Sequence, residues 1–233
     1  MKKLLVIIAI ASFAVACKGK GEKKEGTDTT TTVTPNQDTV TTVTNTDTTV
    51  KNAGDTTIKK TTAENFVNGY GKSAMADVTI PRSLVERLNT TPEQMERFFL
   101  RTLLGSAQGV LFGISAHMAN AMTAIAIACG QDAALVAGTH CANVTCEATK
   151  NGDLYFSAYF PSIFAATVGG GTSFGTAREC LETLGCYGNG KSERFAEIIA
   201  ATALAGEISL MISIVNGTYV YAHETFGRNR PPQ

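Results

Sequence analysis

The sequence divides into two parts of different composition, and this division limits how much of the chain can fold. Residues 18–57 form a low-complexity run of Lys, Gly and Glu followed by Thr, Asp, Asn and Val. Such a run holds too little apolar surface to offset the conformational entropy lost on ordering. We therefore expect residues 18–57 to be a disordered, Thr-rich tether and residues 58–233 to form the folded domain.

The first 17 residues have the pattern of an export signal. Two lysines precede an apolar run over residues 4–16, which at ~1.5 Å per residue is shorter than a bilayer core of about 30 Å. Small residues then precede Cys17, as in a bacterial lipobox, where the cysteine is lipidated. We expect residues 1–17 to be a signal peptide with a lipid anchor on Cys17 in the bacterial envelope. An ordinary signal cut near Ala16, or a leader fused by chance to a cytoplasmic protein, is the alternative.

Charge and cysteine content exclude some functions. Twenty basic residues balance 20 acidic ones, and no basic stripe with interleaved aromatics is present, so we expect no nucleic-acid partner. Five cysteines follow Cys17, and an odd number does not form a complete disulfide framework. The spacing of His140, Cys141 and Cys146 matches no common zinc pattern, so we expect thiols and no metal site. Free thiols favour a reducing compartment, which conflicts with the export signal.

The first half of the domain is predicted to hold a strand and a long helix. Residues 73–80 read as a strand, and Thr91, Pro92 and Gln94 form a strong helix start. The apolar pattern extends this helix over residues 92–129, where it would be a long buried central helix. The alternative is a membrane span over residues 103–129, with glycines at every fourth position. Polar residues in the middle of that run argue against the span.

The second half is predicted to mix strands and helices. The patterns predict strands over residues 142–148 and 154–160, and helices over residues 176–184 and 193–216. Residues 150–153 are a turn signal between the two strands, and Pro161 should end the second strand. The fold class expected from this mixture is α+β, with strands and helices around a long buried central helix.

Three local features allow either a structural or a chemical interpretation. Residues 169–172 precede a helix and could bind an anion through backbone amides, but they match neither nucleotide-binding glycine motif and also fit a tight turn. Asp132 follows a helix end, where an acid is either solvated or catalytic. His223 lies beside Glu224 and could donate a proton near neutral pH, or lie on the surface.

Taken together, the segments resemble the C-terminal half of class I hydroxymethylglutaryl-CoA reductase. The matching segments, in order, are GKSAMADVTIP, LLGSAQG, AHMANAMTAIAIACGQDAA, DLYFSAYFPSIFAATVGGGT, TARECLETLGCYGNGK, FAEIIAATALAGEISLM and AHETFGRNRP. The resemblance covers residues 66–233 and reaches Lys59 when the segment TIKKTTAENFVNGYGK is included. It implies an oligomeric enzyme that reduces hydroxymethylglutaryl-CoA to mevalonate with two hydrides from NADPH and releases coenzyme A.

The resemblance also implies a role for individual residues. The chemistry requires a cation for the thioester oxyanion, a carboxylate pair to manage protons, and an acid for the departing thiolate. The implied catalytic residues are Lys59, Asp132 and His223; the substrate-binding residues are Lys60, Arg101 and Asn120; the cofactor-binding residues are Gly169, Gly170, Gly171 and Arg228. The chain departs from the family at Ile58, where an aspartate is expected, and at Arg101, where a lysine is common.

Two parts of the family's enzyme are missing from this sequence. Neither the E-N-V-x-G motif that carries the catalytic glutamate nor the small NADPH-binding domain with its D-A-M-G-x-N motif is found. We therefore expect negligible turnover from the chain alone, and we expect a homo-oligomer or a separate chain that supplies the N-terminal half. The alternative is a non-catalytic, membrane-tethered module that retains the fold and affinity for coenzyme A.

Overall fold

The computed structural model describes residues 39–44, 63–69, 71–109, 111 and 113–227. The predictions for the signal segment and for four site residues concern residues outside this range. These four are Cys17, Lys59, Lys60 and Arg228.

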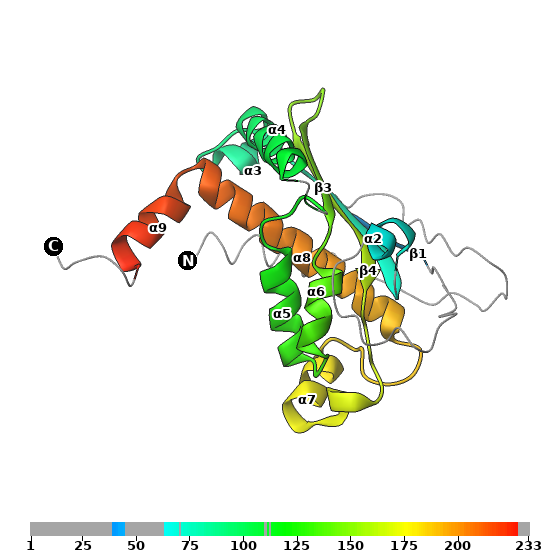
Figure 1. Cartoon of the computed structure of the whole chain (residues 1–233). Helices are drawn as coiled ribbons and strands as arrows, with labels where there is room; N and C mark the ends of the chain where they lie inside the picture. The colour runs from blue at the N-terminus through cyan, green and yellow to red at the C-terminus, as the bar shows by residue number, and fades with distance from the viewer. Residues whose placement is uncertain (1–38, 45–62, 70, 110, 112, 228–233) are drawn as a thin grey trace.

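One antiparallel sheet organises the described part of the fold (Figure 1). Its strand order is β1 (Thr39–Thr44), β2 (Lys72–Ile80), β4 (Leu154–Ile163) and β3 (Asn143–Ala148). β3 and β4 form the predicted hairpin, whose turn includes Gly152 at φ 88°. Along β2, Ala74 and Ala76 are buried toward the core, whereas Met75 between them is exposed. The predicted α+β class is therefore confirmed.

The prediction of a disordered tether over residues 18–57 is wrong for residues 39–44. These six residues form β1 and pair with β2, with Thr39 opposite Val78. Thr and Val are β-branched and favour extended backbone, and the edge of β2 offers the hydrogen-bonding groups they need. The rest of the predicted tether lies outside the described residues.

The prediction that Pro161 ends the second strand of the hairpin is also wrong, because β4 continues to Ile163. β3 pairs with β4 only as far as Tyr159, so Pro161 has no neighbour on that side. On the other side the β2–β4 register shifts between Lys72 and Ala74. A residue without an N–H is tolerated best at such an irregular place in a sheet.

The long central helix is α8 (Ser192–Val215), which crosses the sheet and contacts β1, β2 and β4 (Figure 1). Its fully buried side chains are Phe195, Ala196, Ala200 and Ala203. By length and composition α8 is the one helix in the described ranges that could cross a membrane. However, 56% of its most apolar window is buried inside the fold, which is the behaviour of a core helix.

The helix predicted over residues 92–129 is two helices, α4 (Pro92–Gln108) and α5 (Met118–Ala128). The predicted start of α4 is confirmed, because Thr91 and Gln94 form a capping box. The break includes Gly113 at φ 79°, where a Cβ would lie 2.8 Å from the Ala142 carbonyl oxygen. Ile114 then donates its N–H to the same carbonyl at 2.8 Å. This pairing interrupts the helix and overturns both the single central helix and the membrane span at this place.

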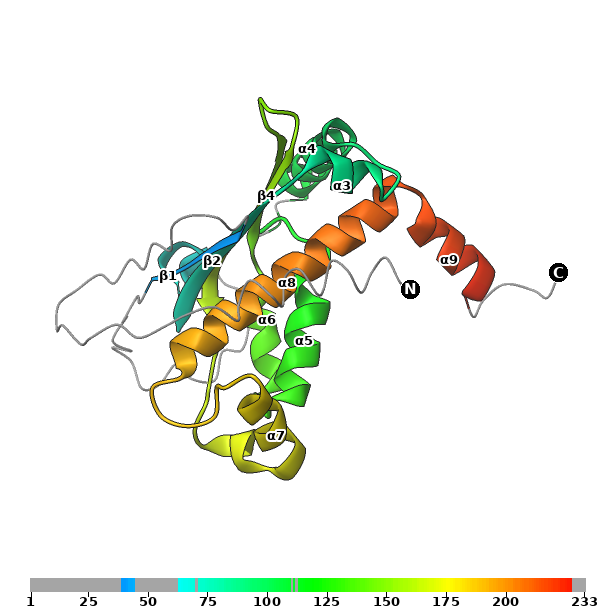
Figure 2. The same ribbon diagram turned by 180° about the vertical axis from the view of Figure 1, so that it is seen from behind.

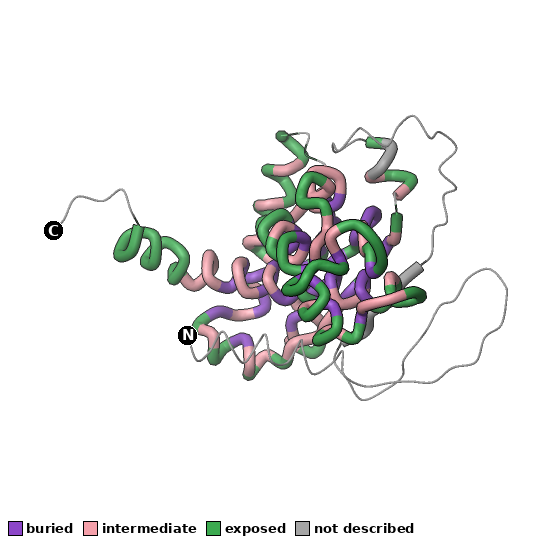
Figure 3. Tube along the Cα trace, turned by 90° about the horizontal axis from the view of Figure 1, so that it is seen from below, coloured by how far each residue is buried: buried purple, intermediate pink, exposed green. Residues whose placement is uncertain are grey.

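The remaining elements are short, and most connect or cap the larger ones. They are α2 (Ala63–Asn68), α3 (Arg82–Glu86), η1 (Ala133–Leu135), α6 (Val136–Thr139), η2 (Gly170–Ser173), α7 (Gly175–Thr183) and α9 (Thr218–Phe226). α9 follows α8 through Gly217 at φ 78° and projects away from the rest of the fold (Figures 1 and 2). None of its residues is buried, as the tube in Figure 3 shows.

A buried carboxylate on α8 anchors the start of α5. Glu207 is 2% exposed, and its two oxygens accept the N–H groups of Ala116 at 2.8 Å and His117 at 2.7 Å. Gly206 beside it makes room for the His117 ring, since a Cβ there would overlap the imidazole. Burial raises the pKa of Glu207, and the two N–H bonds oppose that rise. Burial also lowers the pKa of His117, which favours a neutral ring.

Replacing Glu207 by Ala is expected to lower the free energy of unfolding by about 2–5 kcal/mol, because two buried N–H groups lose their acceptors. Urea denaturation followed by circular dichroism measures this change. The matched control is Glu179→Ala on the exposed side of α7, with an expected change within about 0.5 kcal/mol. Equal losses for both variants would show that the buried carboxylate is not an anchor.

The same residue predicts a pH dependence. Because the folded-state pKa of Glu207 lies above its usual 4.5, the part of the stability that comes from this pKa shift is complete below 4.5 and is lost as pH rises through the folded-state pKa. Glu207→Gln removes this titration and should flatten that part of the stability profile relative to the native chain.

Candidate functional site

Asp132 lies on the loop that follows α5. Its carboxylate accepts the N–H of Ala134 at 3.0 Å and so caps η1. The residue is exposed, so the carboxylate remains open to solvent or to a ligand. Asp132 is therefore an exposed acid after a helix end, as its local sequence suggests, and a ligand could still reach its carboxylate.

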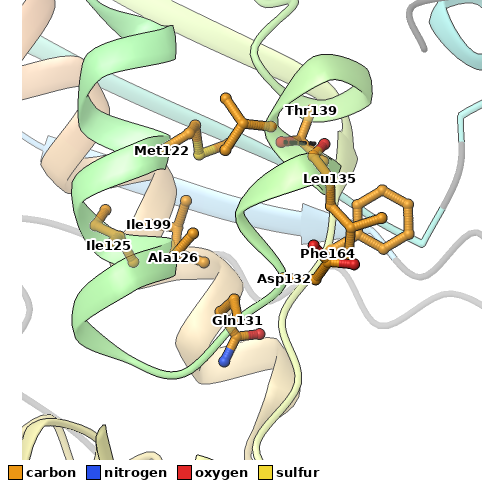
Figure 4. A pocket seen from close by; sticks show the side chains of 10 residues that line it. Met122, Ile125, Ala126, Gln131, Asp132, Leu135, Thr139, Phe164 and Ile199 are labelled. Carbon is orange, nitrogen blue, oxygen red and sulfur yellow. Dashed lines mark hydrogen bonds between the residues drawn. The ribbon is translucent and has the colours of Figure 1, made fainter. Parts of the chain in front are cut away.

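Asp132 borders a small cavity between α5, α6 and the end of β4, where it lies beside Phe164 (Figure 4). The other lining residues are Met122, Ile125, Ala126, Gln131, Leu135, Val136, Thr139 and Ile199. The lining is mostly apolar, and the enclosed space suits about one water molecule. This cavity is too small to hold a coenzyme A thioester, so the substrate surface must lie outside it.

Gln131 fastens the loop before Asp132 to the segment after β4. Its amide nitrogen donates to the carbonyls of Cys129 at 2.8 Å and Ala166 at 2.9 Å. Its amide oxygen accepts the N–H of Ala166 at 2.8 Å. A side-chain amide can donate and accept in this way, whereas a carboxylate would repel both carbonyls. The Gln131 side chain thus pairs with both backbone groups of Ala166, as a neighbouring strand would, and holds the glycine-rich turn near Asp132.

Two glycines let the same two segments approach more closely. Gly130 has φ 64°, and a Cβ there would overlap the backbone of Gly171 and lie 2.9 Å from the Ala177 Cβ. In the reverse direction, a Cβ on Gly171 would lie 2.9 Å from the Gly130 carbonyl oxygen. No side chain fits between these backbones. The structure therefore brings Asp132 and the predicted glycine turn together.

The glycine turn itself is open on its outer side. Gly169 and Gly170 have φ 80° and 54°, and a Cβ on either would meet nothing within 4 Å. Thr172, which is 1% exposed, donates its hydroxyl to the Gly169 carbonyl at 2.6 Å and holds the turn in shape. The prediction of a tight turn before a helix is confirmed by η2 and α7. Its role toward a cofactor stays a prediction.

The other implied site residues lie apart from Asp132 in the described chain. Arg101 is exposed on α4, which contributes no residue to the cavity. Asn120 is exposed on α5, about 200° around the helix from Met122, which lines the cavity. His223 is exposed on α9, where its Nδ1 pairs with the Tyr219 carbonyl at 2.9 Å. Figures 1 and 2 both show α9 far from the lower end of α5, so His223 does not meet Asp132 here.

Sequence reasoning missed the residues that hold the site in shape. Gln131 and Gly130 belong to the quoted segment AHMANAMTAIAIACGQDAA, yet neither is in the predicted set. A glycine directly after an apolar helix was a usable signal, because that position often needs positive φ. The partner of Gln131 could not be foreseen, since it is 35 residues away. Glu207 had no visible signal beyond an acid inside an apolar helix.

Comparison with known proteins shows the family of this chain. Residues 29–228 match the family described as hydroxymethylglutaryl-coenzyme A reductase. The protein named 3-hydroxy-3-methylglutaryl-coenzyme A reductase from Methanothermobacter thermautotrophicus is 44% identical over 175 residues, which cover 74% of this chain and 44% of the relative. The protein of the same name from Pyrococcus horikoshii is 43% identical over 73% of this chain and 43% of its own length. The one from Halobacterium salinarum is 43% identical over 74% of this chain and 44% of its own length.

The chain belongs to the hydroxymethylglutaryl-coenzyme A reductase family. It spans less than half the length of the curated relatives it matches. The family match begins inside the predicted tether and includes β1, which agrees with the pairing of β1 and β2.

Gly130→Ala is expected to lower the free energy of unfolding by about 2–4 kcal/mol, because it adds backbone strain and a clash with Gly171. The matched control is Gly170→Ala, which has positive φ but open space around it. Chemical denaturation of both variants separates the strain from the close approach. If the two variants lose equal stability, the contact between the two backbones contributes nothing.

Proposed function

We propose that this chain is the substrate-domain half of a hydroxymethylglutaryl-CoA reductase and that it acts with a second polypeptide that supplies the remaining half. The observation that carries the proposal is the joined loop pair. Gln131 and the Gly130–Gly171 approach fix Asp132 beside an open glycine turn, within a chain that belongs to this family.

In this proposal, Asp132 is the acid that manages protons while the thioester carbonyl is reduced. Its backbone position is fixed by the Gln131 bonds, and its side chain is exposed, so that a second surface could close over it. A preorganised, later desolvated carboxylate interacts more strongly with a nearby cation than a mobile, solvated one. A lysine in such contact would stabilise the oxyanion, and Lys59 is the candidate in this chain.

NADPH would supply the hydride. The open turn at Gly169 and Gly170 fits a role in contacting part of this cofactor, because its backbone is accessible and no side chain covers it. Thr172 keeps that turn rigid through its buried hydroxyl. In this proposal the second polypeptide would bind most of the cofactor.

His223 would protonate the departing thiolate, but α9 must first come near the loop that carries Asp132. Either α9 from another copy approaches Asp132, or α9 turns about Gly217, which already has a left-handed backbone. α9 also exposes large apolar side chains, including Tyr221 and Phe226, which a partner surface would cover.

The test is a complementation assay with the N-terminal half of an archaeal reductase, hydroxymethylglutaryl-CoA and NADPH, read as absorbance loss at 340 nm. We expect turnover only when both polypeptides are present. Asp132→Asn should reduce that turnover by about 100-fold or more, while Glu179→Gln should leave it unchanged. Clear turnover by the chain alone would disprove the need for a partner, and no turnover on mixing would count against the reductase proposal.

The non-catalytic alternative predicts binding without reaction. Titration calorimetry with coenzyme A on the mixed and isolated chains tests it, because binding that persists without any turnover on mixing would favour a binding module over an enzyme.

We also propose that the leader attaches the chain to a membrane through a lipid on Cys17. The support is the sequence pattern of residues 1–17 alone. Labelled palmitate should enter the native chain expressed in bacteria but not Cys17→Ser. Labelling of both chains, or of neither, would reject the lipid anchor.

A further inference from the structure

Three cysteines meet where α5 ends against α7. Cys129 caps α5 and is 3% exposed, Cys180 lies on α7 and is partly exposed, and Cys186 is fully buried just after α7. All three are free thiols. Burial raises the pKa of Cys129 to about 11, and the charges of the nearby Cys180 and Cys186 add to that rise in this order.

The packing of α5 on α7 favours Cys180 over Cys186 as the neighbour of Cys129. A Cβ on Gly130, the residue after Cys129, would lie 2.9 Å from the Ala177 Cβ, so the end of α5 rests on α7 at this point. Ala177 and Cys180 are three residues apart and share one face of α7. Cys180 is therefore the α7 thiol that faces the end of α5.

Cys186 is held in a different role. Its N–H donates to the Leu181 carbonyl at 2.7 Å, and Gly185 at φ 67° precedes it, which is the Schellman arrangement that closes a helix. Its thiol donates to the Leu184 carbonyl at 3.4 Å, and it belongs to the core cluster. Cys186 thus serves as the buried residue of a helix cap.

We propose that Cys129 and Cys180 form an intrachain disulfide when a low-molecular-weight disulfide is available. The partly exposed Cys180 thiolate attacks that disulfide, forms a mixed disulfide and releases one small thiolate. The Cys129 sulfur then attacks the Cys180 sulfur, the mixed bond breaks, and the second small thiol leaves. Two protein thiols are oxidised, one small disulfide is reduced to two thiols, and the two protons pass to the leaving thiolates.

The bond would connect the two segments that hold the candidate site. Cys129 is three residues before Asp132, and α7 directly follows the glycine turn. The disulfide would therefore lock the approach that Gln131 and Gly130 already maintain. In an oxidising compartment the bond would remove two of the five thiols that follow Cys17. The inference rests on the thiols and does not depend on the proposed reductase activity.

The test uses the full chain, fully reduced and then incubated with glutathione disulfide, with free thiols blocked by N-ethylmaleimide. Peptide mapping by mass spectrometry without reduction should find one link between the Cys129 and Cys180 peptides. Cys146, whose burial raises its pKa to about 12, is the internal control and should be found only as the blocked thiol after unfolding.

Three variants make the outcome decisive. Cys129→Ala should stop at a glutathione adduct on Cys180, Cys180→Ser should form neither the adduct nor the link, and Cys186→Ser should form the native link. Circular dichroism checks that each variant is folded, and the native chain identifies the pair even if a variant is not. A link between Cys180 and Cys186, a stable adduct on native Cys180, or only links between chains would each overturn the proposal.

Discussion

The fold depends on a carboxylate that is buried in the middle of an apolar helix. Glu207 lies on α8, which contacts three strands of the sheet, and it accepts the two N–H groups at the start of α5. A buried charge is costly unless it is hydrogen-bonded, and α5 would otherwise begin with unpaired donors. Each group therefore reduces the penalty of the other. This contact sets where α5 starts. Because the loop that carries Asp132 follows α5, the contact also affects where that loop begins.

The position of the candidate site depends more on close backbone contacts than on interactions between side chains. α5 ends at Cys129, and Gly130 turns the chain so that it meets Gly171 with no side chain between them. Gln131 then completes the junction by pairing with both backbone groups of Ala166. Asp132 is positioned by these neighbours, and its carboxylate accepts the N–H of Ala134 in the short turn that follows. Substitutions beside the acid should thus matter as much to its position as the acid itself.

The described chain assembles only part of the implied site. Asp132 and the glycine turn meet, whereas Arg101, Asn120 and His223 lie on exposed faces of three other helices. Exposed large apolar residues accompany them, such as Leu104 on α4 and Ile127 on α5. An exposed apolar face beside a polar functional residue is typical of a surface that another polypeptide covers.

The sequence by itself determined the elements whose signals are local. The capping box at Thr91, the hairpin turn around Gly152 and the turn before α7 depend on neighbouring residues, and the ordered motifs identified the family. Only the tertiary structure decided three other matters: the break at Gly113, the passage of β4 through Pro161 and the pairing of β1 with β2. Each arises from a strand or carbonyl distant in sequence, which periodicity cannot reveal. The same reason hid Gln131 and Glu207, since their partners lie 35 and about 90 residues away.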